Sequence, residues 1–206
     1  MSLGQVGVQE VDIYYLYSPD LSVALKETLE AIRDIYESGK FKRFGMSNYR
    51  PEDVQKIYDI WKEKGGMLTT VFQGKYNAMS RHIETHLFPL LRKLGIGFYA
   101  CRYARASAHT GDMYKSMYGK ETLYAALDEW NVIAGHANIT KAATAKEKGD
   151  ALIVGASKVE QLEETLGAIE AGPLDVETAT EVDATWGLVE REAPLDNYNS
   201  HAWKLN

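Results

Sequence analysis

Cysteine is nearly absent from this 206-residue chain: Cys101 is the only one, so no disulfide can form within the chain. A lone cysteine fits a reducing compartment. Long apolar runs are missing too, since none approaches the roughly 20 residues that span a bilayer. Residues 1–10 lack the basic and apolar regions of a secretory signal. We therefore expect a cytoplasmic protein that does not enter a membrane.

Basic residues are scarce, with 23 against 29 acidic ones, and the net charge of −6 argues against a nucleic-acid partner. Low-complexity tracts, repeats and obvious linkers are also missing. The remaining composition, 45% hydrophobic and 25% charged, is that of an ordinary globular protein. We expect a single domain over residues 1–206, with a poorly ordered tail at 194–206, where the chain is polar with scattered aromatics.

The chain does have a regular alternation of short β-rich runs and amphipathic stretches. The pattern predicts strands at 11–17, 44–48, 68–73, 96–101 and 151–156, and helices at about 22–39, 51–64, 83–94, 121–146, 159–171 and 175–192. The apolar first strand is typical of one buried on both faces, and Ser22 is a candidate cap for the first helix. Helices between successive strands imply right-handed crossovers and a parallel sheet. Periodicity alone does not distinguish a closed barrel from an open sheet.

The strand ends carry a more specific signal. Four segments occur in this order: Val-Asp-Ile-Tyr-Tyr-Leu-Tyr-Ser-Pro-Asp (11–20), Gly-Met-Ser-Asn-Tyr (45–49), Val-Phe-Gln-Gly-Lys-Tyr-Asn (71–77) and Val-Gly-Ala-Ser-Lys-Val-Glu-Gln-Leu-Glu-Glu-Thr (154–165). Together they resemble the aldo-keto reductases, most closely the aflatoxin-aldehyde reductase branch and its fungal relatives. The resemblance covers about residues 11–192. It implies an α/β fold, a partial (β/α)₈ TIM barrel in which this chain supplies strands four to eight.

The resemblance also implies a cofactor, NADPH, bound without a Rossmann motif. Consistently, no Gly-x-Gly-x-x-Gly follows a predicted strand. By resemblance, Ser47, Asn48 and Gln73 hydrogen-bond the nicotinamide carboxamide, which offers one acceptor and two donors. The positions that match the site of the adenosine 2′-phosphate and adenine are Ser157, Gln161 and Glu164, and Lys158 adds a positive charge there. That site lies at a helix N-terminus, which favours anions. Thr165 and Ala156 depart from the family's pattern.

None of the family's catalytic residues has a match at its expected position in this sequence. The family's Asp, Tyr and Lys would lie upstream of Met1, and Tyr17 stands where the family has its His. We therefore expect this chain alone to be deficient in ordinary carbonyl reduction. Tyr17 is a candidate replacement acid; the alternative is an aromatic side chain that fills space at a strand end. We expect Asp12 to be structural, and the same holds for Tyr76 and Asn77 in the turn after the third strand.

Two further segments depart from the family. Where it has a loop that wraps the pyrophosphate, residues 101–111 keep only Thr110-Gly111, and Cys101 takes the position that stacks on the nicotinamide. The segment 139–145 runs directly into 146–150, which implies a deletion of about one or two helical turns. Arg102 and Arg105 are candidate anion ligands or part of a solvated loop. His82 and His86 have the i,i+4 spacing of metal ligands, but no third ligand is evident, and we expect no metal.

The sequence is compatible with three functions, and we expect the ligand to be a small-molecule substrate. One is a degenerate NADP(H)-linked aldo-keto reductase acting on aldehydes or ketones. Another is a repurposed non-redox enzyme, such as a cyclase, dehydratase or isomerase, using Tyr17 and Arg102. The last is a non-catalytic binding subunit. Because five strands leave two apolar sheet edges, we also expect a homodimer, a complementing chain, or coverage by the terminal segments.

Overall fold

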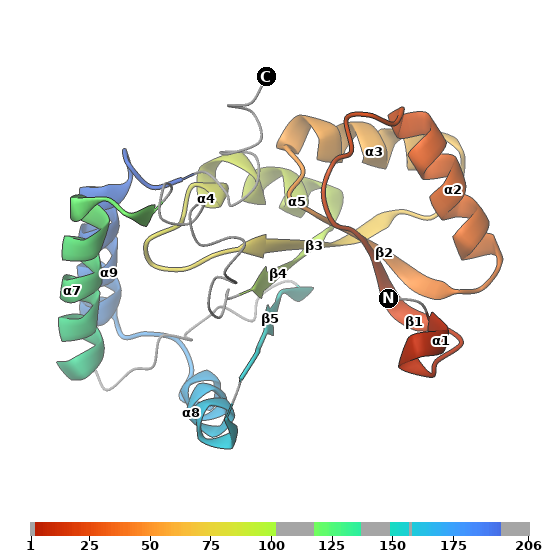
Figure 1. The fold of residues 1–206 in the computed structure, drawn as a ribbon. Helices are drawn as coiled ribbons and strands as arrows, with labels where there is room; N and C mark the ends of the chain where they lie inside the picture. The colour runs from red at the N-terminus through yellow and green to blue at the C-terminus, as the bar shows by residue number, and fades with distance from the viewer. Residues whose placement is uncertain (1–2, 102–117, 137–148, 157, 195–206) are drawn as a thin grey trace.

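A computed structural model describes residues 3–101, 118–136, 149–156 and 158–194 (Figure 1). The strands in these ranges are β1 (Val11–Leu16), β2 (Phe41–Ser47), β3 (Thr69–Lys75), β4 (Gly97–Cys101) and β5 (Ala151–Ile153). The helices are α1 (Leu3–Val6), α2 (Leu25–Glu37), α3 (Pro51–Glu63), α4 (Ile83–His86), α5 (Phe88–Leu94), α7 (Glu121–His136), α8 (Val159–Glu170) and α9 (Val176–Val189).

The strands form one parallel sheet in the order β1-β2-β3-β4-β5. Strand order therefore follows chain order, whereas the sheet of a doubly wound fold reverses its order at a switch point. The sheet curls into a half-barrel with helices on its convex face (Figure 1). This architecture confirms the expected partial (β/α)₈ barrel.

The main core lies between the sheet and helices α2, α3 and α5. The interior strand β2 is the most deeply buried, and its Phe44 and Met46 side chains have no exposed surface. Trp61 of α3 packs edge-on against Phe44, with ring centroids 6.2 Å apart. β1 is only half-buried, so the expected burial of the first strand on both faces is wrong: β1 is an edge strand.

A second, smaller core joins α7 to α9, which lie side by side away from α2 and α3 (Figure 1). Trp130 and Ile133 of α7 pack with Val182 of α9. By contrast, α8 buries none of its side chains fully. None of the described helices combines the length and the apolar character that crossing a bilayer requires.

Several predicted bounds need correction. Ser22 does not cap α2: its N–H and hydroxyl both donate to Asp20, and Ala24 is the N-cap residue. The predicted helix 83–94 is two helices that meet at Leu87. Pro89, in the first turn of α5, has no N–H with which to continue α4.

The strand bounds shift as well. β2 begins three residues earlier than predicted, at Phe41, because its first residues pair with β1. β3 runs on to Lys75 through its pairing with β4, and β5 ends at Ile153. The predicted helix 121–146 is described only up to His136, and the tail at 195–206 lies outside the described residues.

Candidate functional site

The site begins where β1 and β2 end. Asn48 follows β2 with φ of 61°, the one positive φ outside glycine among the described residues. Asparagine tolerates this left-handed conformation better than most residues. Its side-chain Nδ2 donates to the Tyr17 carbonyl oxygen at 2.8 Å and to Ser47 Oγ at 3.1 Å. Asn48 thus ties the end of β1 to the end of β2 at the carboxyl edge of the sheet.

The predicted nicotinamide residues come together at this edge. Ser47 on β2 is the register partner of Gln73 on β3, and Asn48 is bonded to Ser47. The Ser47 side chain is buried, whereas Gln73 and Asn48 are half-buried. The structure therefore places a hydroxyl and two carboxamides within one small region. Their role toward a nicotinamide stays a prediction.

On the concave face of the half-barrel, Asp12, Arg43 and Tyr99 are connected by hydrogen bonds, and we call this row the polar ladder. Arg43 on β2 donates to Asp12 on β1, at 3.2 Å from Nε and 2.5 Å from Nη2, and to the Tyr99 hydroxyl on β4 at 3.3 Å. The hydrogen-bonded Arg43 holds the pKa of Asp12 below its ordinary value. Asp12 thus has a structural role as the partner of Arg43. Through Arg43 and Tyr99, it is connected from β1 to β2 and β4.

Tyr15 lies next to this ladder, over Gly45. A Cβ atom at Gly45 would be 2.6 Å from a Tyr15 ring carbon, so the ring occupies the space that a side chain would need. Burial is the largest cause that raises the pKa of Tyr15 to about 12, and its neighbour Tyr99 raises it further. Tyr15 is therefore a neutral phenol at physiological pH.

Lys75 and Cys101 are register partners at the carboxyl ends of β3 and β4. The Cys101 thiol donates to the Gly74 carbonyl oxygen at 3.3 Å. Burial raises the pKa of this thiol, and a hydrogen bond from Gln73 and the charge of Lys75 oppose the rise only in part. Burial also lowers the pKa of Lys75 to about 8. The pair therefore combines a protonated thiol with an amine that is partly neutral near physiological pH.

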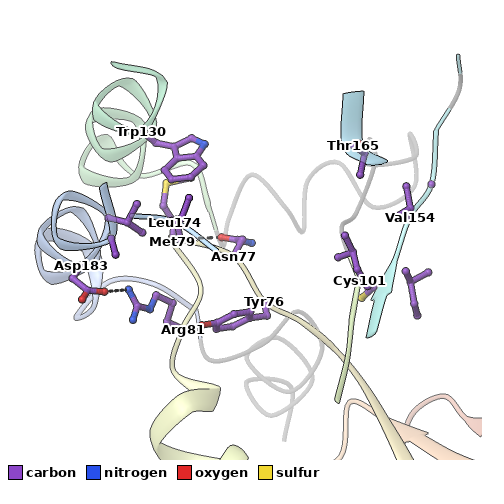
Figure 2. Close-up of a pocket in the computed structure, with 16 residues that line it drawn as sticks. Tyr76, Asn77, Met79, Arg81, Cys101, Trp130, Val154, Thr165, Leu174 and Asp183 are labelled. Atoms are coloured by element: carbon purple, nitrogen blue, oxygen red, sulfur yellow. Dashed lines mark hydrogen bonds and ion pairs between the residues drawn. The ribbon is translucent and has the colours of Figure 1, made fainter. Parts of the chain in front are cut away.

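Beyond Cys101 lies a cavity of about 300 Å³ between β4, β5, the β3–α4 connection and the α7–α9 pair (Figure 2). One side is apolar, and Trp130, Met79 and Leu174 gather there (Figure 2). Arg81 and Asp183 form a 2.5 Å ion pair on its wall. Arg81 also binds Glu84.

Tyr76 and Asn77 line the same cavity and shape the turn after β3. Asn77 Oδ1 accepts the Met79 N–H at 3.0 Å, and the backbones of Asn77 and Ser80 form a bridge. The Tyr76 hydroxyl donates to Glu84 at 2.5 Å. This agrees with the structural role expected for both residues.

The predicted adenosine-end residues lie on α8, apart from the nicotinamide group. Lys158 is the N-cap residue, with extended backbone and no side-chain capping bond. The side chains of Gln161 and Glu164 in the first two turns are exposed. Ser157 lies outside the described residues. Thr165 faces the cavity that also contains Cys101.

The remaining candidates are scattered. Tyr17 follows β1 at the rim of the sheet, with 58% of its surface exposed. His82 packs on Trp186 and its ring Nε2 lies 3.1 Å from the Ala193 carbonyl oxygen. In the described part of the chain, no three His, Cys, Asp or Glu side chains cluster as metal ligands do. Arg102 and Arg105 lie outside the described residues.

Comparison with known proteins identifies the family. The model of the aldo/keto reductase family matches residues 1–186. This chain is an aldo/keto reductase family member. It is 37% identical to the oxidoreductase sirO of Leptosphaeria maculans over 219 aligned residues, which cover 92% of this chain and 67% of that protein. It is 34% identical to aldo-keto reductase family 7 member A3 of Homo sapiens over 230 residues, covering 94% and 70% of the two chains.

A third relative, an aldo-keto reductase of Pseudocercospora fijiensis, is 33% identical over 221 residues, covering 92% of this chain and 75% of the relative. Each alignment is longer than the 206 residues of this aldo/keto reductase. The relatives therefore contain residues, within the matched span, that have no counterpart here. This agrees with the internal deletion expected from the sequence. Family membership supports an oxidoreductase of aldehydes or ketones.

Sequence reasoning assigned no role to Lys75 or Arg43. The signal for Lys75 was its spacing of two from Gln73, which puts both side chains on one face of a strand. The signal for Arg43 was that a charged residue stands within the run that forms the interior strand β2. Neither signal indicates which partners lie opposite, because these come from neighbouring strands.

Proposed function

We propose that this aldo/keto reductase holds NADP(H) across the carboxyl edge of its half-barrel and acts in the reduction of an aldehyde or ketone. The observation that carries the proposal is the register pairing of Ser47 with Gln73, with Asn48 bonded beside them. Ligands of barrel enzymes bind at the carboxyl ends of the strands. The single cysteine supports a cytoplasmic location as part of the same proposal.

The residues present fit a nicotinamide in type. A carboxamide needs donors for its oxygen and acceptors for its two N–H groups. Asn48 directs its Nδ2 at two protein oxygens. By resemblance, Asn48 contributes its side-chain amide to the ligand, and its hydrogen bond also orients Ser47. Gln73 brings both a donor and an acceptor.

The predicted adenosine site at the N-terminus of α8 is suited to bind an anion. Because Lys158 provides no side-chain cap to α8, the first N–H groups of this helix have no side-chain acceptor from the N-cap residue. A 2′-phosphate would accept from them and pair with the ammonium of Lys158. Gln161 and Glu164 would reach the adenine from the same helix, and Ser157, which precedes Lys158 in the sequence, would bind the phosphate.

When bound, NADPH supplies the hydride, and the protein supplies proton donation and polarisation at the carbonyl oxygen. No segment of this sequence matches the family's Asp, Tyr and Lys motifs. Tyr17 is the acid that the proposal assigns, in place of the family's His. Turnover by this chain alone is therefore expected to be slow.

Titration with NADPH, followed by intrinsic fluorescence, tests the proposal, because four Trp and 13 Tyr give ample signal. We expect saturable quenching that Gln73→Ala and Ser157→Ala each weaken by about tenfold, the loss of one or two hydrogen bonds to a charged or polar ligand. Gln55→Ala is the matched control, since the Gln55 side chain binds Asp59 on the outer helix α3; it should leave the affinity unchanged.

Absence of quenching at millimolar NADPH, or an equal effect of all three substitutions, would overturn the cofactor assignment. Turnover of a carbonyl compound without cofactor would then favour the non-redox enzyme. A stable protein partner with no small ligand would favour the binding subunit.

A further inference from the structure

Lys75 stands at the end of β3, on the concave face of the half-barrel. Alternate residues of a strand share a face, so Lys75 lies on the side of Gln73. The intervening Gly74 faces the opposite side, where a Cβ atom would meet the Phe98 ring at 2.8 Å. Across the sheet, Lys75 is in register with Cys101. The amine therefore belongs to the same edge as the predicted nicotinamide residues.

Among the described residues, the groups around this amine are aromatic or uncharged. Its Nζ lies 3.7 Å from the centroid of the Tyr118 ring. None of the ion pairs formed by the described residues involves Lys75. In the described ranges, Cys101 is the titratable side chain whose charge acts on the pKa of Lys75, and burial raises the pKa of that thiol. Arg43 and Tyr99, also on the concave face, bond to each other.

We propose that Lys75 is a carbonyl-capturing amine that forms a Schiff base with an aldehyde. The lone pair of Nζ forms a bond to the carbonyl carbon, and the π electrons of the carbonyl move to its oxygen, which takes up a proton. The carbinolamine then loses water, formed from that oxygen and the two amine hydrogens, and a C=N bond results. Oxidation states do not change, so neither an oxidant nor a reductant is required.

Three features of the site favour this reaction. The amine must be neutral to attack, and burial with no carboxylate partner in the described part of the chain increases its neutral fraction. A half-buried site beside the Tyr118 ring also limits the access of the water that would hydrolyse the C=N bond. The position beside Gln73 puts the captured carbonyl carbon at the carboxyl edge, where barrel enzymes hold their substrates. Exposed lysines such as Lys56 on α3 have none of these features.

This inference does not rest on nicotinamide binding, and its test contains no NADPH. The full chain is incubated with propanal, reduced with sodium borohydride, digested, and the propylated lysines are quantified by mass spectrometry across a pH series that brackets 8. We expect labelling of Lys75 to rise to half its maximum near pH 8. At neutral pH it should exceed that of exposed Lys56 by about tenfold or more, because burial lowers the pKa of Lys75 and so raises its neutral fraction.

Lys75→Arg should remove the fast-labelling fraction, and the matched change Lys56→Arg should leave it intact. Equal labelling of Lys75 and Lys56 in the unaltered protein would overturn the proposal, as would fast labelling that survives in Lys75→Arg. Circular dichroism checks that each variant folds. If Lys75→Arg does not fold, Lys75→Met replaces it, and the site-resolved pH profile of the unaltered chain decides the question by itself.

Discussion

Gly45 illustrates how single residues shape the candidate site. It lies on the interior strand β2, and the space beside its Cα is filled by the ring of Tyr15 from the neighbouring strand β1. The Tyr15 ring then lies close enough to Tyr99 and Arg43 for their charges to affect its pKa. One missing side chain therefore allows a dense aromatic and polar layer on the concave face.

Replacement of Gly45 by alanine should destabilise the protein by about 1–3 kcal/mol, the usual cost of overpacking, because the new methyl group would lie 2.6 Å from the Tyr15 ring. Gly187→Ala is the matched change on α9, where nothing lies within 4 Å. It should stabilise by up to about 1 kcal/mol, as for glycine within a helix. Urea denaturation measures both. Equal effects of the two substitutions would contradict the role of Gly45.

At the scale of elements, one carboxylate supports the pairing of β5 with β4. Asp150 precedes β5 and accepts two hydrogen bonds from the Arg92 guanidinium. It also accepts a hydrogen bond from the Phe98 N–H at 2.8 Å. β5 has three residues, and α8 after it buries no side chain fully. The position of β5 beside β4 therefore rests on these hydrogen bonds together with the strand pairing and the contact of Leu152 with the main core.

Asp150→Ala should therefore cost about 2–3 kcal/mol, because it leaves the Arg92 guanidinium and the Phe98 N–H without their partner. Hydrogen exchange at β5 should accelerate more than at β2. Glu37→Ala, which removes the exposed ion pair with Arg33, should change stability by less than about 0.5 kcal/mol. Urea denaturation with exchange measured by mass spectrometry gives both quantities, and unchanged exchange at β5 would refute this account.

At the scale of the whole molecule, the half-barrel presents two terminal strands. β1 and β5 stand at opposite ends of the strand order, and no other strand of the described ranges pairs with their outer edges. Backbone N–H and C=O groups at such edges bind further strands readily. β1, with six residues, offers the longer template.

We therefore propose that β1 pairs with a second copy or with a complementing chain. The molar mass from light scattering should rise with protein concentration, and the amides of β1 should exchange more slowly in the associated form. A monomer at all concentrations with slow exchange at both β1 and β5 would contradict this pairing. That result would indicate that segments of the same chain cover the edges.

The sequence by itself determined the order and type of the main elements, because hydrophobic period and turn residues are local properties of the chain. It also identified the family through the segments at the strand ends, and so predicted that Ser47 and Gln73 would lie together. It failed where a local pattern was ambiguous: Ser22 had a closer partner in Asp20, and Pro89 divided a helix whose apolar spacing continues through it.

Only the tertiary structure decided which side chains meet across the strands. Arg43 bonds residues 31 and 56 positions away along the chain, and this follows from the strand order and register. The lowered pKa of Lys75 and the cavity beside Cys101 have the same origin. Both depend on how much water and charge the neighbouring elements exclude, and burial is a property of the packed fold that a linear pattern does not encode.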